Sequence, residues 1–323
     1  SIASGKDTLG LMPTGGGKSI TFQVYSLSGE GLCLVITPLI ALMKDQVENL
    51  KSRGIKAIAV YSGMSSNEID IALDNCIYGD IKIVYMSPER LCSDLARKRI
   101  EKMKVNLVAV DEAHCISQWG YDFRPSYLQI AQIRELHPSV PILALTATAT
   151  VPVIEDIQKN LLFKNNNVFS TSFNRPNLTY ACLEEEDKNN RIIRMLNRVQ
   201  GSAIIYVRNR KKTVEISNLL NKNNITADYY HAGLPPAIRD IKQMQWMKSQ
   251  KRVMVATNAF GMGIDKPDVR MVIHFDLPDS PEAYFQEAGR AGRDGLKAFA
   301  ILLYNHSDIL EARKNFSNAY PPI

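Results

Sequence analysis

The sequence has little of what marks secreted, membrane-spanning or metal-stapled proteins. Its five cysteines include no C-x-x-C pair and show no zinc-type spacing with histidine, so neither a disulfide framework nor a zinc site is expected. No apolar run approaches the roughly 18 residues that cross a bilayer, and residues 1–9 lack the pattern of a secretory signal. Low-complexity segments and sequence repeats are also absent. These absences predict a soluble intracellular protein with no membrane partner.

The bulk composition is that of a globular protein with a mild basic bias. A chain of 323 residues with 45% hydrophobic residues can form two domains. Acidic and basic residues balance over 1–174, so the net charge of +6 comes entirely from 175–323. Such a bias suits a polyanionic partner, although many proteins with neutral ligands are equally basic. The chain lacks an initiator Met and reaches a first strand at residues 9–12, which predicts a longer parent protein.

Short apolar runs alternate with amphipathic stretches along the whole chain. The runs are LGLM, LCLVITP, IAVY, IKIVYMSP, NLVAVDE and PILALTAT, then SAIIYV, ITADYYHA, RVMVATNA, VRMVIHFD and AFAILLY. Near-continuous apolar strands separated by helical patterns, such as 211–223 and 238–249, predict α/β domains with parallel sheets. Residues 161–178 break this rhythm with Asn, Ser and Pro, which predicts a linker. We therefore expect two tandem domains, 1–174 and 175–323.

A glycine-rich loop, PTGGGKS, follows the first apolar run. Glycines allow backbone N–H groups to turn toward a phosphate, and a helix starting near Lys18 adds its dipole. Lys18 would reach the β- and γ-phosphates, and the Ser19 hydroxyl would bind Mg²⁺. The strict P-loop pattern has Gly where this chain has Met12, and a plain mobile turn is the alternative. The candidate nucleotide-binding residues are Thr14, Gly15, Gly16, Gly17, Lys18 and Ser19.

Two further segments offer chemistry for phosphoryl transfer. The strand NLVAV runs into Asp111 and Glu112, which places carboxylates at the end of a parallel strand, where such sheets bind ligands. Asp111 can hold Mg²⁺ and Glu112 can deprotonate water; an acidic helix start is the alternative. In QEAGRAGRDG, Arg290 and Arg293 lie about one helical turn apart, so their guanidiniums can face the same way and act as an arginine finger. The alternative is that the two arginines belong to a solvated basic helix end without a catalytic role.

These segments, in this order, resemble superfamily 2 helicases and most specifically the RecQ family of DNA helicases. The matching blocks are MPTGGGKS, TPLIALMKDQV, YMSPERL, DEAHCISQWGYDFRPSY, LTATAT, IIYVRNRKK, YYHAGL, VATNAFGMGIDKPDVR and QEAGRAGRDG. The resemblance implies two tandem RecA-like domains. It also implies ATP and Mg²⁺ as cofactors, with no zinc in this chain, and interdomain coupling through LTATAT.

The resemblance also assigns residues of the second half. Gly263 and Asp265 would contact the nucleotide, and Gln286, Arg290 and Arg293 would take part in catalysis, with Arg293 favoured as the finger and Arg290 as its structural neighbour. The expected flanking elements of the family are an adenine-recognising Gln motif upstream, and zinc-binding and winged-helix modules downstream; they lie outside this chain.

The aromatic segment after DEAH corresponds to the family's DNA-sensing loop. Aromatic faces stack on unpaired bases with little sequence preference, and Arg124 can add charge. We expect Trp119, Phe123 and Arg124 to contact DNA, together with Tyr121, which stands where the family usually has His. DNA-backbone contacts are expected from loops at strand ends, although each such residue could be a cap or a turn former. They are Thr37, Pro38, Ser87, Pro88, Arg208, His231 and Thr257.

The resemblance implies a monomeric 3′-to-5′ DNA helicase core that couples Mg-ATP hydrolysis to translocation on single-stranded DNA and unwinding of tailed or forked DNA in recombination, repair or replication. Its expected location is the bacterial cytoplasm or the nucleus, and no protein partner is indicated. One alternative is a nucleotide-dependent DNA-binding ATPase module that does not unwind. Another is an RNA-directed or protein-directed motor, against which the QWGYDFRP loop argues.

Overall fold

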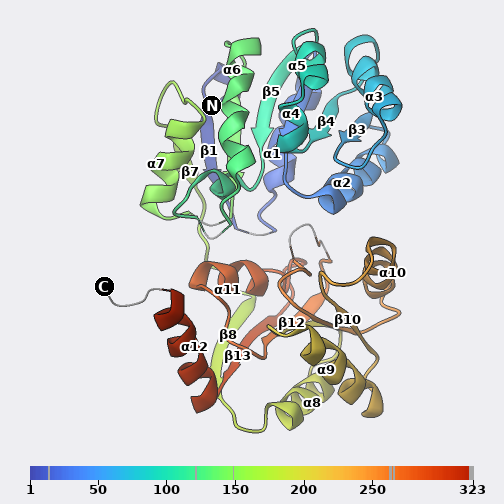
Figure 1. Cartoon of the computed structure of the whole chain (residues 1–323), viewed down its shortest axis with the longest axis vertical. Helices are drawn as coiled ribbons and strands as arrows, with labels where there is room; N and C mark the ends of the chain where they lie inside the picture. The colour runs from blue at the N-terminus through green and yellow to red at the C-terminus, as the bar shows by residue number, and fades with distance from the viewer. Residues whose placement is uncertain (14, 121, 148, 262–263, 265, 320–323) are drawn as a thin grey trace. The chain divides into compact units, whose positions relative to one another are not determined.

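The computed structural model describes residues 1–323 except 14, 121, 148, 262–263, 265 and 320–323. The chain divides into two compact units, Ser1–Phe173 and Asn174–Ile323. Each unit has its own sheet flanked by helices (Figure 1). The division lies one residue before the boundary that the sequence suggested.

The first unit is built on a seven-stranded sheet in the order β3-β4-β2-β5-β6-β1-β7. All its strand pairs are parallel. The strands are β1 Thr8–Leu11, β2 Leu32–Ile36, β3 Ala57–Val60, β4 Ile83–Met86, β5 Val105–Val110, β6 Ile142–Thr146 and β7 Val168–Ser170. Parallel strands place their carboxyl ends at one edge, so the loops that follow β1, β2, β4 and β5 can meet there.

Helices of the first unit connect these strands. They are η1 Ile2–Ser4, α1 Lys18–Ser28, α2 Ile40–Ser52, α3 Ser66–Tyr78, α4 Pro88–Leu91, α5 Asp94–Ile100, η2 Ala113–Ile116, η3 Pro125–Gln132, α6 Ile133–Leu136 and α7 Val151–Asn160. The start of α3 shows why its bounds are sharp. Ser65 Oγ accepts a hydrogen bond from Glu68 N at 3.3 Å, and Ser65 N donates to Glu68 Oε2 at 2.8 Å. This reciprocal capping satisfies two donors of the helix start.

The apolar cores lie on the two faces of the sheet. Leu32, Leu34 and Ile36 belong to one buried cluster, whereas Cys33 and Val35 belong to the other. Successive side chains of a strand point to opposite faces, so a strand covered on both sides needs an unbroken apolar run. This explains why LCLVI shows no polar alternation.

The second unit has a six-stranded parallel sheet in the order β10-β11-β9-β12-β13-β8. Its strands are β8 Leu178–Glu184, β9 Ser202–Tyr206, β10 Ala227–Tyr230, β11 Val253–Ala256, β12 Val269–His274 and β13 Ala298–Tyr304. Its helices are α8 Lys188–Arg198, α9 Arg210–Lys222, α10 Pro236–Met247, α11 Pro281–Ala288 and α12 His306–Ala319. The predicted fold, two tandem domains with parallel sheets and flanking helices, is confirmed.

Two strands lie where the sequence predicted a linker or showed no strand pattern. β7 pairs with β1 through Leu9 and Val168, and its three residues are exposed. β8 pairs with β13 along seven positions and is buried mainly at Leu178. Both are edge strands, whose polar composition follows from having one face or one side in water. In the part of the chain that the structure describes, no helix is long and apolar enough to span a bilayer.

Candidate nucleotide and nucleic-acid sites

The glycine-rich loop forms a tight connection from β1 to α1. Gly15 and Gly17 have φ of 79° and 83°, a left-handed conformation that disfavours residues with a Cβ. A Cβ on Gly16 would lie 2.9 Å from the Pro13 carbonyl oxygen, whose hydrogen bond from Gly16 N is also 2.9 Å. The three glycines are therefore required by the loop's own geometry, and the loop presents backbone rather than side chains. Thr14 lies outside the described residues.

Lys18 and Ser19 are the first two residues of α1, and both are half-buried. The helix has no acidic residue in its first turn and no side-chain N-cap, so its first N–H groups have no carboxylate or hydroxyl partner of their own there. Unpaired N–H groups and the helix dipole together favour an anion at this end. The arrangement suits a phosphate.

Asp111 directly follows β5, and its main-chain N donates to Ile36 O at 2.9 Å. Burial raises the pKa of Asp111, and the neighbouring Glu112 raises it further, whereas the charge of Lys18 opposes the rise. Two residues from distant parts of the chain thus interact electrostatically at the carboxyl edge of the sheet. A buried carboxylate with a cationic neighbour is a frequent feature of functional sites.

Glu112 has a left-handed backbone, with φ of 48°, although it is not glycine. Such strain persists where the surrounding structure imposes it, often at functional sites. Its Oε2 is buried with no hydrogen-bond partner among the described residues, and His114 Nδ1 lies 3.4 Å away. A carboxylate oxygen held without a donor remains available to a substrate molecule such as water.

His114 was not singled out from the sequence, which offered only its place in the DEAH block. Its ring is buried, and burial lowers its pKa, so the imidazole is neutral at pH 7. Nδ1 and the Thr146 hydroxyl form a hydrogen bond of 2.9 Å. Thr146 ends β6 within LTATAT, so this bond joins the two motifs; Thr148 lies outside the described residues.

Magnesium would find two of the predicted oxygen ligands here, the Ser19 hydroxyl at the start of α1 and the Asp111 carboxylate at the end of β5. Over the described part of the chain, no group of three or more His, Cys, Asp or Glu side chains could hold a metal by itself. A Mg²⁺ ion bound at these residues would therefore complete its shell with phosphates and water, as it commonly does in nucleotide sites.

The aromatic segment runs between η2 and η3. Trp119 is 76% exposed. Ser117 Oγ accepts a hydrogen bond from Trp119 N at 3.2 Å and donates to Asp156 of α7 at 2.6 Å. A Cβ on Gly120 would lie 2.6 Å from the His114 carbonyl oxygen, so only glycine fits this turn. The loop is thus anchored to the buried DEAH segment while its indole faces water.

The other predicted members of this loop have different surroundings. Phe123 and Arg124 are half-buried, and Arg124 Nη2 pairs with Asp122 at 3.0 Å. Tyr127 is fully buried and donates to Asp111 O at 2.9 Å. It therefore supports the turn that carries the Asp111 and Glu112 carboxylates (the carboxylate turn), and it is not part of an exposed aromatic surface. Tyr121 lies outside the described residues.

Two hydroxyls follow the adjacent strands β2 and β4 of the first unit. Thr37 Oγ1 and Ser87 Oγ are both buried, and neither atom has a hydrogen-bond partner among the described residues. Leaving a buried hydroxyl unpaired costs about 1–3 kcal/mol, a cost that a ligand oxygen would remove. Pro38 is half-buried beside Thr37, and Pro88 begins α4.

In the second unit, Arg208, His231 and Thr257 follow β9, β10 and β11. These three strands are neighbours in the sheet, so the residues share its carboxyl edge. His231 stacks on Tyr229 with ring centroids 5.9 Å apart, and Thr257 is buried. The structure therefore brings the three predicted phosphate-contacting residues of this unit to one edge.

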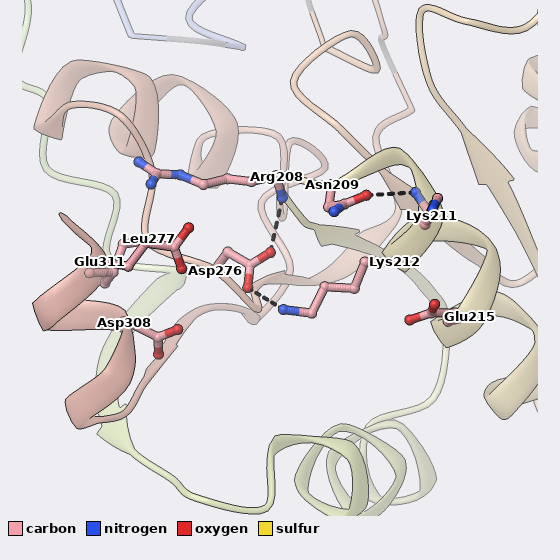
Figure 2. A pocket seen from close by; sticks show the side chains of 9 residues that line it. All are labelled: Arg208, Asn209, Lys211, Lys212, Glu215, Asp276, Leu277, Asp308 and Glu311. Carbon is pink, nitrogen blue, oxygen red and sulfur yellow. Dashed lines mark hydrogen bonds and ion pairs between the residues drawn. The ribbon is translucent and has the colours of Figure 1, made fainter. Parts of the chain in front are cut away.

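Arg208 lies beside a surface depression of about 340 Å³ (Figure 2). The Asp276 carboxylate accepts hydrogen bonds from Arg208 N at 3.0 Å and from Lys212 Nζ at 2.6 Å. The Arg208 side chain pairs with the exposed Asp279 at 2.7 Å. An exposed pair of this kind contributes little, so a phosphate could replace Asp279. Because Glu215, Asp308 and Glu311 also line it, the depression is not itself an anion site.

The arginine segment corrects one argument from the sequence. α11 ends at Ala288, and Arg290 and Arg293 lie in the turns beyond it, so one helical turn does not align their side chains. Arg290 is only 4% exposed, and its charge opposes the rise that burial causes in the pKa of the Tyr206 phenol. Arg293 is half-buried, and its Nη1 donates to Ile264 O at 3.0 Å.

This region contains three further residues that were predicted to bind the nucleotide or take part in catalysis. Gln286 is half-buried in the last turn of α11. Gly263 and Asp265 lie outside the described residues. No sequence pattern pointed to Arg175, whose guanidinium contacts the turn that carries Arg290.

Comparisons with known proteins agree with this geometry. Residues 1–157 match the DEAD/DEAH box helicase family, and residues 187–295 match the helicase conserved C-terminal domain. The chain is 45% identical over 310 residues to the ATP-dependent DNA helicase RecQ of Bacillus subtilis (strain 168), covering 95% of this chain and 52% of that protein. It is 44% identical over 305 residues to RecQ of Pasteurella multocida (strain Pm70), with 94% and 48% covered.

A solved structure extends the likeness in fold. S. cerevisiae Dbp5 bound to RNA and ADP BeF3 is similar with a TM-score of 0.71 at 19% identity, covering 98% of this chain and 84% of that chain. Identity this low concerns the fold alone. The chain spans about half the length of the RecQ proteins it matches. With both helicase domains present and RecQ similarity along nearly its whole length, the chain belongs to the RecQ family of helicases.

Proposed function

We propose that this chain is the motor core of an ATP-dependent DNA helicase, moving 3′ to 5′ on single-stranded DNA and unwinding tailed or forked duplexes. One observation carries the proposal. Lys18, which directly follows the glycine loop, and the carboxylate of Asp111 interact electrostatically at the carboxyl edge of the first sheet, in a chain that is 45% identical to an ATP-dependent DNA helicase.

The proposed roles at the nucleotide follow from position and chemistry. Backbone N–H groups at Gly15–Gly17 and the start of α1 bind phosphates, and Lys18 adds its charge. Ser19 and Asp111 hold Mg²⁺, which would stabilise negative charge on the phosphates. Glu112 accepts the proton of the attacking water through its unpaired buried oxygen. Arg293 acts as the finger.

The proposed DNA contacts lie at the carboxyl edges of both sheets and at the exposed Trp119. The unpaired hydroxyls of Thr37 and Ser87 suit phosphate oxygens, and Arg208 supplies charge. Trp119 stacks on an unpaired base. Occupation of the loop reaches the hydrolytic residues through the chain that joins Trp119 to Glu112, in which His114 bonds Thr146.

A second candidate is a DNA-stimulated ATPase that does not separate strands. The observation in its favour is that the chain spans about half the length of the relatives it matches. Hydrolysis stimulated by DNA without release of a strand from a 3′-tailed duplex would support this candidate, whereas release would support the helicase. A 5′-tailed duplex serves as the control for direction.

Lys18→Ala tests the proposal, and Lys56→Ala is its matched control because Lys56 is exposed and pairs with the exposed Asp80 at the surface. We expect Lys18→Ala to lower DNA-stimulated phosphate release by more than about 100-fold, since the charge it supplies acts on the transferred phosphate. Lys56→Ala should stay within about twofold of wild type. Wild-type turnover by Lys18→Ala, or equal stimulation by RNA and DNA, would contradict the proposal.

A further inference from the structure

Arg175 binds three main-chain carbonyls of a single turn. Its Nη1 donates to Gly289 O at 2.9 Å, and its Nη2 donates to Ala291 O at 2.8 Å and Gly292 O at 2.5 Å. The turn follows α11, includes Arg290 and leads directly into Arg293. One guanidinium therefore holds the segment that carries both arginines.

The chemistry of this contact is suited to fixing a backbone. Carbonyl groups at and beyond a helix end lack intrahelical donors, so they need partners from elsewhere. A guanidinium offers several N–H donors in a rigid plane, which a lysine cannot reproduce. Burial lowers the pKa of Arg175, and the three carbonyl dipoles replace the water that the group has lost.

Asn177 holds the far end of the same turn. Its Nδ2 donates to Gly292 O at 2.7 Å and to Leu296 O at 3.0 Å, and its main-chain carbonyl accepts a hydrogen bond from Ala298 N at 2.9 Å. Gly292 has φ of 62°, and a Cβ there would lie 2.7 Å from Asn177 Nδ2. Side chains of the NRPNL segment, residues 174–178, thus hold the turn in place. The sequence had predicted this segment to be part of a linker.

We propose that Arg175 is a positioning residue for nucleotide hydrolysis, which fixes the turn of residues 289–292 so that the following Arg293 is presented in one orientation. The inference rests on the proposed function, in which Arg293 acts on the transferred phosphate. Arg175 is the second residue of the second unit, so the connection between the two units joins the chain one residue before this guanidinium. A change in the direction of that connection would reach the arginine turn through Arg175.

The chain offers a matched control for a purely structural role. Arg252 also donates to three main-chain carbonyls of the second unit, those of Gly201 at 3.0 Å, Val199 at 2.7 Å and Leu196. Burial lowers its pKa as well. Arg252→Ala and Arg175→Ala therefore remove the same kind of contact, but only Arg175 touches the arginine turn.

Hydrolysis kinetics give the first readout. We expect Arg175→Ala to lower the DNA-stimulated kcat for ATP by at least about tenfold with KM changed by less than about threefold, because a finger acts mainly in the transition state. Arg175→Lys, with fewer donors, should give an intermediate kcat. Arg252→Ala should keep the wild-type kcat. A kcat for Arg175→Ala and Arg175→Lys equal to that of Arg252→Ala would overturn the inference.

Hydrogen exchange gives a second readout that does not depend on hydrolysis. Peptides covering residues 286–296 should exchange faster in Arg175→Lys and Arg175→Ala than in wild type, and at the wild-type rate in Arg252→Ala. Unchanged exchange in both Arg175 variants would overturn the positioning role. The two readouts separate the two proposals. Absence of ATP hydrolysis by the wild-type chain would contradict the proposed function. The exchange rates of the Arg175 variants relative to wild type would still show whether Arg175 holds the turn.

Discussion

Trp119 and Tyr127 lie eight positions apart in the same aromatic stretch, yet their surroundings are opposite. Trp119 is 76% exposed, whereas Tyr127 has no exposed surface and donates its hydroxyl to Asp111 O at 2.9 Å. One indole is therefore available to an unpaired base, and one phenol supports the carboxylate turn. What distinguishes Trp119 is its place, because its main-chain N is hydrogen bonded to Ser117, directly after the buried residues 113–116.

Trp119→Ala should lower DNA-stimulated ATP hydrolysis more than the basal rate. Stacking on one base contributes about 1–3 kcal/mol, so we also expect the Kd for a single-stranded oligonucleotide to rise about 5- to 150-fold. Fluorescence anisotropy and phosphate release, with and without DNA, measure the two effects. Tyr78→Ala is the matched control, because Tyr78 is 79% exposed on α3 of the same unit. Equal loss of basal and stimulated rates in Trp119→Ala would show that the loop is structural.

At the scale of elements, hydrogen bonds join η2 and the residue that follows it to β6 and α7. His114 of η2 bonds Thr146 at the end of β6, and Ser117, which follows η2, donates to Asp156 of α7. The LTATAT segment, residues 145–150, begins with the last two residues of β6 and is followed directly by α7. A displacement of the aromatic loop would therefore act on both ends of that segment, which gives a physical route between the loop and Glu112.

Asp156→Asn should weaken this route, because it replaces a charged acceptor of the Ser117 hydroxyl by a neutral amide. We expect the stimulation of hydrolysis by DNA to fall about three- to tenfold, with the basal rate within about twofold of wild type. Glu68→Gln is the control, since Ser65 Oγ donates to Glu68 Oε2 at 2.7 Å in the same unit, away from the site. Stimulation that falls equally in both variants would indicate a loss of stability rather than of coupling.

At the scale of the whole molecule, charge is distributed unevenly. The net charge of +6 comes from residues 175–323, whereas 1–174 are balanced. The proposed DNA contacts of the first unit are mostly hydroxyls and an aromatic ring, and Arg208 of the second unit is a cation whose side chain pairs with the exposed Asp279 carboxylate. Contacts to phosphates therefore depend mainly on the second unit and carry little sequence information.

Binding to single-stranded DNA should weaken steeply with salt and vary little with sequence. Release of counterions from neutralised phosphates predicts a linear fall of log K with log salt between about 50 and 200 mM. Arg208→Gln should reduce that slope by about one. Titrations of poly-pyrimidine and mixed-sequence oligonucleotides at several salt concentrations measure both quantities. A slope near zero, or a strong preference for one sequence, would contradict this account of the contacts.

Much of the proposed nucleotide site could be predicted because its signals are local. The glycines at 15–17 are required by positive φ and close approach within six residues of chain, and Asp111 directly follows an apolar strand. Arg290 and Arg293 were placed by a local rule too, but that rule assumed a helix that ends at Ala288. Spacing in sequence aligns side chains only while the helix continues.

The central strands, the glycine-rich loop, the carboxylate pair and the RecQ membership followed from the sequence alone, because apolar periodicity and short motifs act over a few residues. Folding was needed to show which aromatic is buried, that β7 and β8 are strands, and that Arg175 holds the arginine turn. Edge strands with polar side chains are defined by pairing with a partner strand rather than by their own composition. Likewise, Arg175 meets carbonyls more than a hundred residues away, and no local pattern records a contact made by folding.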